Sequence, residues 1–154
     1  MELNEQQTFL LDTFSEIINN ENTTTINLSR NIGVPIGDAR TATIDMDDVE
    51  KLGNGEYVCA VGAIVHETFE QYGIQKTPAE EKDTPKKLDT VIYYNHNRAS
   101  RRESKVVGAT IPPERSIDSN SLVINISSKE SKPIGKVTCT LKNGSIVSVE
   151  REKF

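Results

Sequence analysis

Residues 57–72 read YVCAVGAIVHETFEQY, and this stretch decides the expected fold. From Val58 to Val65 it carries no charged side chain. That length gives about two helical turns that are apolar on nearly every side, which predicts a helix buried inside the protein. Three polar residues follow at the far end of the stretch, namely His66, Glu67 and Glu70.

His66 and Glu70 are four residues apart, so they project from one face of this helix, one turn apart. An imidazole and a carboxylate on a buried helix are costly unless other groups satisfy them. The rest of the sequence is therefore expected to supply their partners.

Residues 88–107, LDTVIYYNHNRASRRESKVV, predict a second helix that offers such partners. One stripe at helical spacing contains Leu88, Ile92, His96, Ala99, Glu103 and Val107, and the opposite side contains Asn97, Arg98, Arg101, Ser104 and Lys105. His96 and Glu103 share the apolar face because seven residues make nearly two turns. The small Ala99 between them lets another helix approach. Two helices are thus expected to present a His and a Glu to each other.

The bulk composition limits the class of protein. A chain of 154 residues is expected to form one domain, residues 1–154, with a core that is small and aliphatic because apolar content is 35% and Trp is absent. The net charge of −5 argues against nucleic acid as a partner. Cys59 and Cys139 are expected to be reduced core residues, in a helix and a strand respectively.

The sequence shows no secretory leader and no apolar run of about 18 residues, so a soluble domain is expected, without a membrane partner. Such a domain is either cytoplasmic or delivered elsewhere as part of a larger chain.

The N-terminal half predicts one helix and two short strands. Residues 4–20 form an amphipathic pattern with Asn4 as N-cap and an apolar face of Leu10, Phe14, Ile17 and Ile18. Residues 23–29 and 40–45 are expected to be strands, the second at a sheet edge beside the site, with a loop at 31–38 between them.

The acidic run after Asp45 has a faint similarity to a calcium loop, but the position that requires Gly holds Glu50. The favoured interpretation is that Asp47 caps a short helix that ends at Gly53. Residues 73–87 are expected to be a mobile surface loop able to cover the site.

The C-terminal part predicts strands at 121–127, 137–141 and 146–150, with Asn143-Gly144 as a hairpin turn. The expected fold is therefore α+β: an N-terminal helix, short strands, two central site-bearing helices and C-terminal antiparallel strands.

The favoured hypothesis for the site is a metal centre. His66 and His96 would supply imidazoles, and Glu70 and Glu103 carboxylates, a set that suits zinc with one position open to water. Glu67 could then reach that water as general base, and the reaction would be hydrolysis of a peptide bond. The alternative is a metal-free polar network in which His66 bonds to Glu103, and Glu70 to His96.

Two further interpretations are weaker. Residues 94–98 (YNHNR) faintly suggest a His-Asn nuclease finger, which would require a hairpin where a helix is predicted. Cys59 could pair with His66 as a nucleophile, but an apolar setting raises the pKa of a thiol and makes it inert.

The run His66-Glu67-Thr68-Phe69-Glu70 resembles the H-E-x-x-H helix of zinc metallopeptidases, the zincins, with Glu70 in place of the second His. Extended by H-x-x-A-x-x-x-E from His96 and by Val107-Gly108, the pattern resembles small metallopeptidase-like domains at the C-termini of Rhs-type polymorphic toxins of bacteria. The resemblance covers residues 57–108, about a third of the chain.

The resemblance implies a secreted toxin or effector with a protein or peptide substrate and an immunity or inhibitor protein as partner. It makes His66 and His96 the firmest ligands, while Glu70 and Glu103 could exchange roles, one on the metal and one orienting a histidine. Glu70 in place of His adds negative charge and weakens the Lewis acid. The departure also fits a domain that has kept the fold without peptidase activity, and so a non-catalytic interaction or metal-binding domain.

Overall fold

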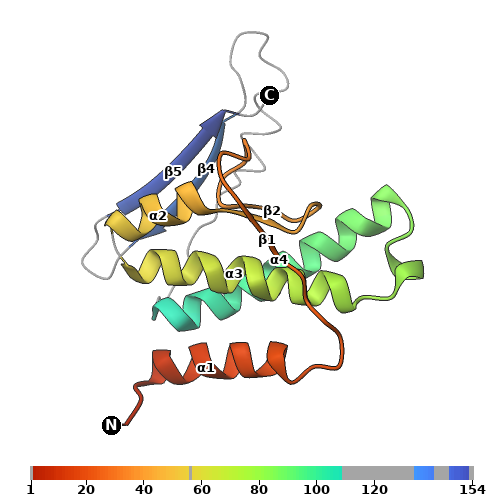
Figure 1. Cartoon of the computed structure of the whole chain (residues 1–154), viewed down its shortest axis with the longest axis horizontal. Coiled ribbons are helices and arrows are strands. Elements are labelled where there is room, and N and C mark those ends of the chain that lie inside the picture. Colours follow the sequence, from red (N-terminus) through yellow and green to blue (C-terminus); the bar gives the residue numbers. More distant parts are fainter. Residues whose placement is uncertain (1, 56, 109–133, 141–145, 153–154) are drawn as a thin grey trace.

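The α+β fold is confirmed by the computed structural model, which describes residues 2–55, 57–108, 134–140 and 146–152 (Figure 1). Its elements are, in chain order, α1 (Glu5–Ile18), β1 (Asn27–Ser29), β2 (Gly37–Asp38), β3 (Thr43–Asp45), α2 (Met46–Gly55), α3 (Tyr57–Lys76), the 3₁₀ turn η1 (Ala79–Glu81), α4 (Pro85–Val107), β4 (Ile134–Thr140) and β5 (Ile146–Glu152). The predicted strand at 121–127 and the Asn143-Gly144 turn lie outside the described residues.

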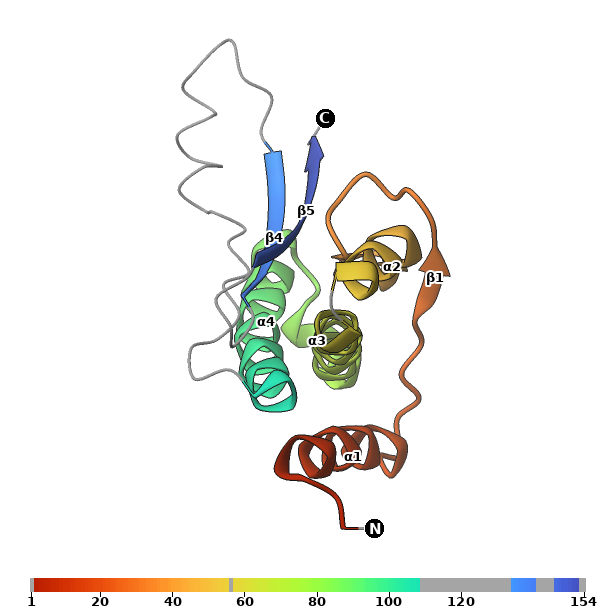
Figure 2. The ribbon, with the colours of Figure 1, turned by 90° about the vertical axis from the view of Figure 1, so that its left-hand side faces the viewer.

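Helix α3 is the centre of the molecule, as its apolar sequence predicts. Helices α4, α2 and α1 all contact it and surround it in the end-on view (Figure 2). Even its polar segment is enclosed, because His66, Glu67 and Glu70 are all buried. Any chemistry on this helix therefore takes place in the interior.

Helix α4 lies alongside α3, and small residues allow the close approach. Ala99 is fully buried and packs against Phe69 and Tyr72 of α3. On α3, a Cβ added at Gly73 would lie 1.9 Å from Asn95 Oδ1 of α4. Gly73 thus belongs to the helix–helix interface and not to the predicted loop at 73–87, which is wrong for its first four residues.

We expect Gly73→Ala to lower the free energy of unfolding by about 1–3 kcal/mol, because the added methyl overpacks the interface with Asn95. Gly53→Ala is the matched control, since its added Cβ would meet Ala60 Cβ at 3.3 Å, a close contact but far less severe than the 1.9 Å at Gly73. Both substitutions gain the same helix propensity, so denaturant unfolding of the two isolates the packing cost. Equal midpoints for the two variants would contradict the close packing described.

Helix α4 begins at Pro85, three residues earlier than predicted, because Thr84 caps it and Pro suits the first helical turn. The prediction that Ser104 faces outward is wrong. Its hydroxyl donates to the carbonyl of Ser100 at 2.8 Å, which satisfies it in a buried position.

The first three strands form a small mixed sheet in the order β1-β3-β2, with β1 parallel and β2 antiparallel to β3. Of the predicted strand at 40–45, only residues 43–45 form a strand, and this strand, β3, lies at the centre of the sheet and not at its edge. Strand β2 is at an edge and comes from residues predicted to be loop. The predicted strand at 23–29 is reduced to β1, whose residues are all exposed.

Helix α2 starts at Met46, so the predicted cap at Asp47 and end at Gly53 are wrong. The carboxylate of Asp45 accepts from the backbone N–H of Asp47 at 3.0 Å, which places the capping carboxylate two residues earlier. On α1, by contrast, the predicted cap is present: Asn4 accepts from the N–H of Gln7 at 2.8 Å. Ile18, predicted on the apolar face of α1, is 76% exposed.

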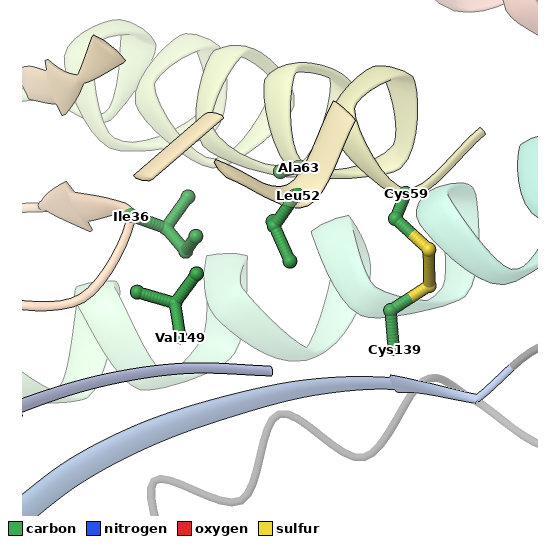
Figure 3. Packing of buried hydrophobic residues seen from close by; sticks show 6 residues of the cluster. All are labelled: Ile36, Leu52, Cys59, Ala63, Cys139 and Val149. Carbon is green, nitrogen blue, oxygen red and sulfur yellow. A yellow bond between two sulfur atoms is a disulfide. The ribbon is translucent and has the colours of Figure 1, made fainter. Parts of the chain in front are cut away.

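The C-terminal hairpin of β4 and β5 is antiparallel as predicted. The hairpin is attached to helix α3 by a disulfide between Cys59 of α3 and Cys139 of β4, which was not predicted (Figure 3). The expectation of two reduced cysteines is wrong: the residues are 80 positions apart, and only the fold brings their Cα atoms to 6.0 Å. Cys59 is therefore not a free thiol nucleophile.

Among the described residues, no helix has both the length and the apolar content that crossing a membrane requires.

Candidate metal centre

The structure brings together the His and Glu residues that the two helical patterns predict. His66 Nε2 lies 3.1 Å from His96 Nδ1 and 3.8 Å from Glu70 Oε2, and His96 Nδ1 lies 3.5 Å from Glu70 Oε1. One ligand atom from each of these three residues falls within 4.8 Å of the others. We call His66, Glu70 and His96 the His/Glu cluster.

These separations match the ligand spacing of a small tetrahedral ion. Two ligand atoms at 2.0–2.2 Å from one tetrahedral zinc are about 3.3–3.6 Å apart. The three observed separations lie on either side of that value, although the two distances from Glu70 are made by different oxygens, Oε2 to His66 and Oε1 to His96. Binding of zinc by all three side chains would therefore require them to adjust. Three protein ligands also leave the fourth position for a water or substrate, as catalytic zinc sites do.

Glu103 lies on the other side of His66. Its Oε2 is 2.8 Å from His66 Nδ1, and because a carboxylate can only accept, Nδ1 carries the proton and donates. In a neutral His66 the lone pair is then on Nε2, the nitrogen that faces His96 and Glu70. A carboxylate that orients a histidine in this way is a common feature of zinc sites.

The charge of the four side chains also favours a cation. With both imidazoles neutral and both carboxylates ionised, the four side chains carry a charge of −2. Glu70 and Glu103 are 3% and 6% exposed, so water screens this charge poorly. A divalent ion would cancel it.

The cluster reaches the surface at His96. His66 is fully buried, while the side chain of His96 retains 24% of its exposure. A hollow of about 460 Å³ lies further along α3, beside Gln71 and Gln75, but its lining does not include the His/Glu cluster. Among the described residues, the part of the cluster nearest to solvent is therefore His96, on the α4 side.

Glu67, the predicted general base, points to strand β2. A Cβ added at Gly37 would lie 2.3 Å from Glu67 Oε2, so the carboxylate occupies the space beside this glycine. Gly37 was predicted to lie in a loop, and its contact with Glu67 was not predicted. The only available signal in the sequence was the glycine itself, which allows another group to approach closely but does not show that this group is Glu67.

The weaker interpretation of residues 94–98 as a nuclease finger has no structural support, because His96 lies within α4, as predicted, and not in a hairpin. No known protein family, curated protein or solved structure matches the chain. The assignment of a function therefore depends on the geometry of the site.

Proposed function

We propose that this chain is a metal-dependent hydrolase, a zinc peptidase-like domain that acts as a toxin or effector. The observation that carries the proposal is the convergence of His66, Glu70 and His96 at ligand spacing, with Glu103 on the outer nitrogen of His66. The order H-E-x-x-E on α3 also places Glu67 next to a ligand, as in the zincins that this run resembles.

Each residue has a distinct role in this proposal. His66, His96 and Glu70 would hold zinc, which when bound supplies a Lewis acid that polarises a carbonyl and lowers the pKa of a water. Glu103 keeps His66 in the tautomer that exposes Nε2 to the ion. Glu67, whose carboxylate lies beside Gly37 of β2 and outside the His/Glu cluster, would be the base that accepts the proton of the attacking water and passes it to the leaving amine.

The disulfide supports delivery out of the cytoplasm. Disulfides persist in oxidising compartments and are rare in cytosolic proteins. The Cys59–Cys139 bond thus favours the secreted effector over a cytoplasmic enzyme. The partners would be a protein or peptide substrate and an immunity or inhibitor protein.

A second candidate function is a metal-free interaction domain. The separation of 3.1 Å between His66 Nε2 and His96 Nδ1 is also that of a hydrogen bond, provided that His96 Nδ1 carries a proton. In this alternative, the cluster and Glu103 only hold α3 against α4.

The test is the zinc content of the purified, disulfide-bonded protein, measured by elemental mass spectrometry. We expect one zinc per chain, and we expect His96→Ala to lose it, because two remaining ligands hold zinc far more weakly. Asn97→Ala, one position further along α4, is the matched control and should retain the ion.

Absence of zinc after dialysis against the metal would contradict the proposal and leave the polar network. Zinc that survives His96→Ala would place the metal elsewhere.

A further inference from the structure

The turn before β2 has an unusual backbone. Ile36 has a φ of +64°, and the N–H of Gly37 donates to the carbonyl of Pro35 at 2.8 Å, which closes a three-residue γ-turn. A positive φ is rare for a β-branched residue, and this type of γ-turn is strained. Such strain persists only where the surrounding structure imposes the conformation.

Contacts on every side of Ile36 impose it. Its N–H donates to the carboxylate of Asp48 at 3.1 Å, and its carbonyl accepts from the N–H of Asp45 at 2.7 Å. Its side chain is fully buried in the core cluster that includes the disulfide (Figure 3), together with Leu52, Cys59, Ala63, Cys139 and Val149.

The chain from residue 30 to residue 36 is held by two sets of carboxylates. The buried carboxylates of Asp45 and Asp48 hold it more firmly than the exposed ion pairs of Arg30 do. Arg30 donates to Glu50 at 2.6 Å and also pairs with Asp47. The bond between Arg30 and Glu50 raises the pKa of the Arg30 guanidinium and lowers the pKa of the Glu50 carboxyl. These groups are exposed, so water screens the pairing. Asp45 and Asp48 are 0% and 1% exposed, and their bonds to the backbone are not screened in this way.

The strained turn delivers Gly37 to Glu67. The position of Gly37 leaves no room for a Cβ, because the Glu67 carboxylate fills that space. Glu67 lies on the face of α3 that meets Gly37 of β2. One turn further along that face, Gln71 donates to the carbonyl of Ala39 at 3.0 Å. The segment from Ile36 to Ala39 therefore lies directly on this face.

We infer that Asp48 and the Ile36–Gly37 turn are positioning elements that fix the carboxylate of Glu67. Asp48 holds the turn, the turn places the backbone of Gly37, and Gly37 limits where the carboxylate can lie. The catalytic meaning of this arrangement rests on the proposed function, whereas the contact between Gly37 and Glu67 does not.

The test is a double-substitution cycle of Gly37→Ala with Glu67→Ala, read by thermal unfolding of the disulfide-bonded protein. We expect Gly37→Ala alone to lower the unfolding midpoint by about 5 °C, because the added methyl collides with Glu67. In the Glu67→Ala background the same substitution should cost about 1 °C or less, since the colliding side chain is absent.

An equal loss in both backgrounds would overturn the inference. If Gly37→Ala alone does not fold, we expect the double variant Gly37→Ala, Glu67→Ala to fold. If neither variant folds, the inference is contradicted. This readout needs neither metal nor activity, so it is informative even if the proposed hydrolase function is wrong.

Asp48 is tested in the same way. Asp48→Ala removes the acceptor of the Ile36 N–H, whereas Asp48→Asn keeps an acceptor oxygen and is the matched control. A positioning role predicts that Asp48→Ala reduces the coupling between Gly37 and Glu67 at least twofold and that Asp48→Asn preserves it. A merely structural Asp48 would lower stability but leave the coupling unchanged, which would contradict its assigned role.

Discussion

Glu67→Gln is expected to lower peptide hydrolysis by about 10²–10⁴-fold, the usual contribution of a general base. An amide of nearly the same shape keeps the contact with Gly37 but cannot accept the proton of the attacking water. The zinc content and the unfolding midpoint should therefore stay close to those of the unchanged protein. The measurement is cleavage of a peptide library by the zinc-loaded protein, followed by steady-state kinetics that separate kcat and KM for any peptide that is cut.

Glu81→Gln is the control, because it makes the same chemical change at an exposed glutamate of η1 that does not belong to the His/Glu cluster. Hydrolysis that survives Glu67→Gln would remove Glu67 from the chemistry. A zinc-loaded protein that cuts no peptide would favour the metal-binding interaction domain, in which Glu70 in place of His has accompanied the loss of activity.

The part of the site that the sequence predicts is the part that depends on helical periodicity. His66 and Glu70 had to share a face of α3, and His96 and Glu103 a face of α4, because the helix repeat leaves no alternative. The apolar run of α3 predicts its central position, and the small Ala99 predicts the contact between the helices. These inferences need only local sequence, which explains their success.

Tertiary contacts decide what the sequence could not predict. Glu70 and Glu103 are equivalent in the pattern, and only the packing of α4 shows that Glu103 faces the outer nitrogen of His66. The γ-turn at Ile36 contradicts the preference of a β-branched residue, so no local rule predicts it. The disulfide joins residues 80 positions apart in the chain, a distance at which spacing carries no information.

Loss of the Cys59–Cys139 bond is expected to have the largest effect on stability. A cross-link that closes a loop of 80 residues stabilises a protein by about 4 kcal/mol, mainly by restricting the unfolded chain. For a chain of this size that corresponds to a fall of about 10–15 °C in the unfolding midpoint. The measurement is thermal unfolding of the Cys59→Ser, Cys139→Ser double variant, and of the unchanged protein with and without a dithiol reductant.

The same variant separates the two halves of the site. The His/Glu cluster is built from α3 and α4 alone, so at low temperature zinc should remain bound without the disulfide. The Ile36 side chain shares its core cluster with Val149 and Cys139 of the hairpin, so the coupling between Gly37 and Glu67 should weaken once the disulfide no longer holds the hairpin. Retained zinc with lost coupling would show that the ligands and the base are held by different parts of the fold. Loss of zinc together with the disulfide would instead mean that the hairpin supports the contact between α3 and α4.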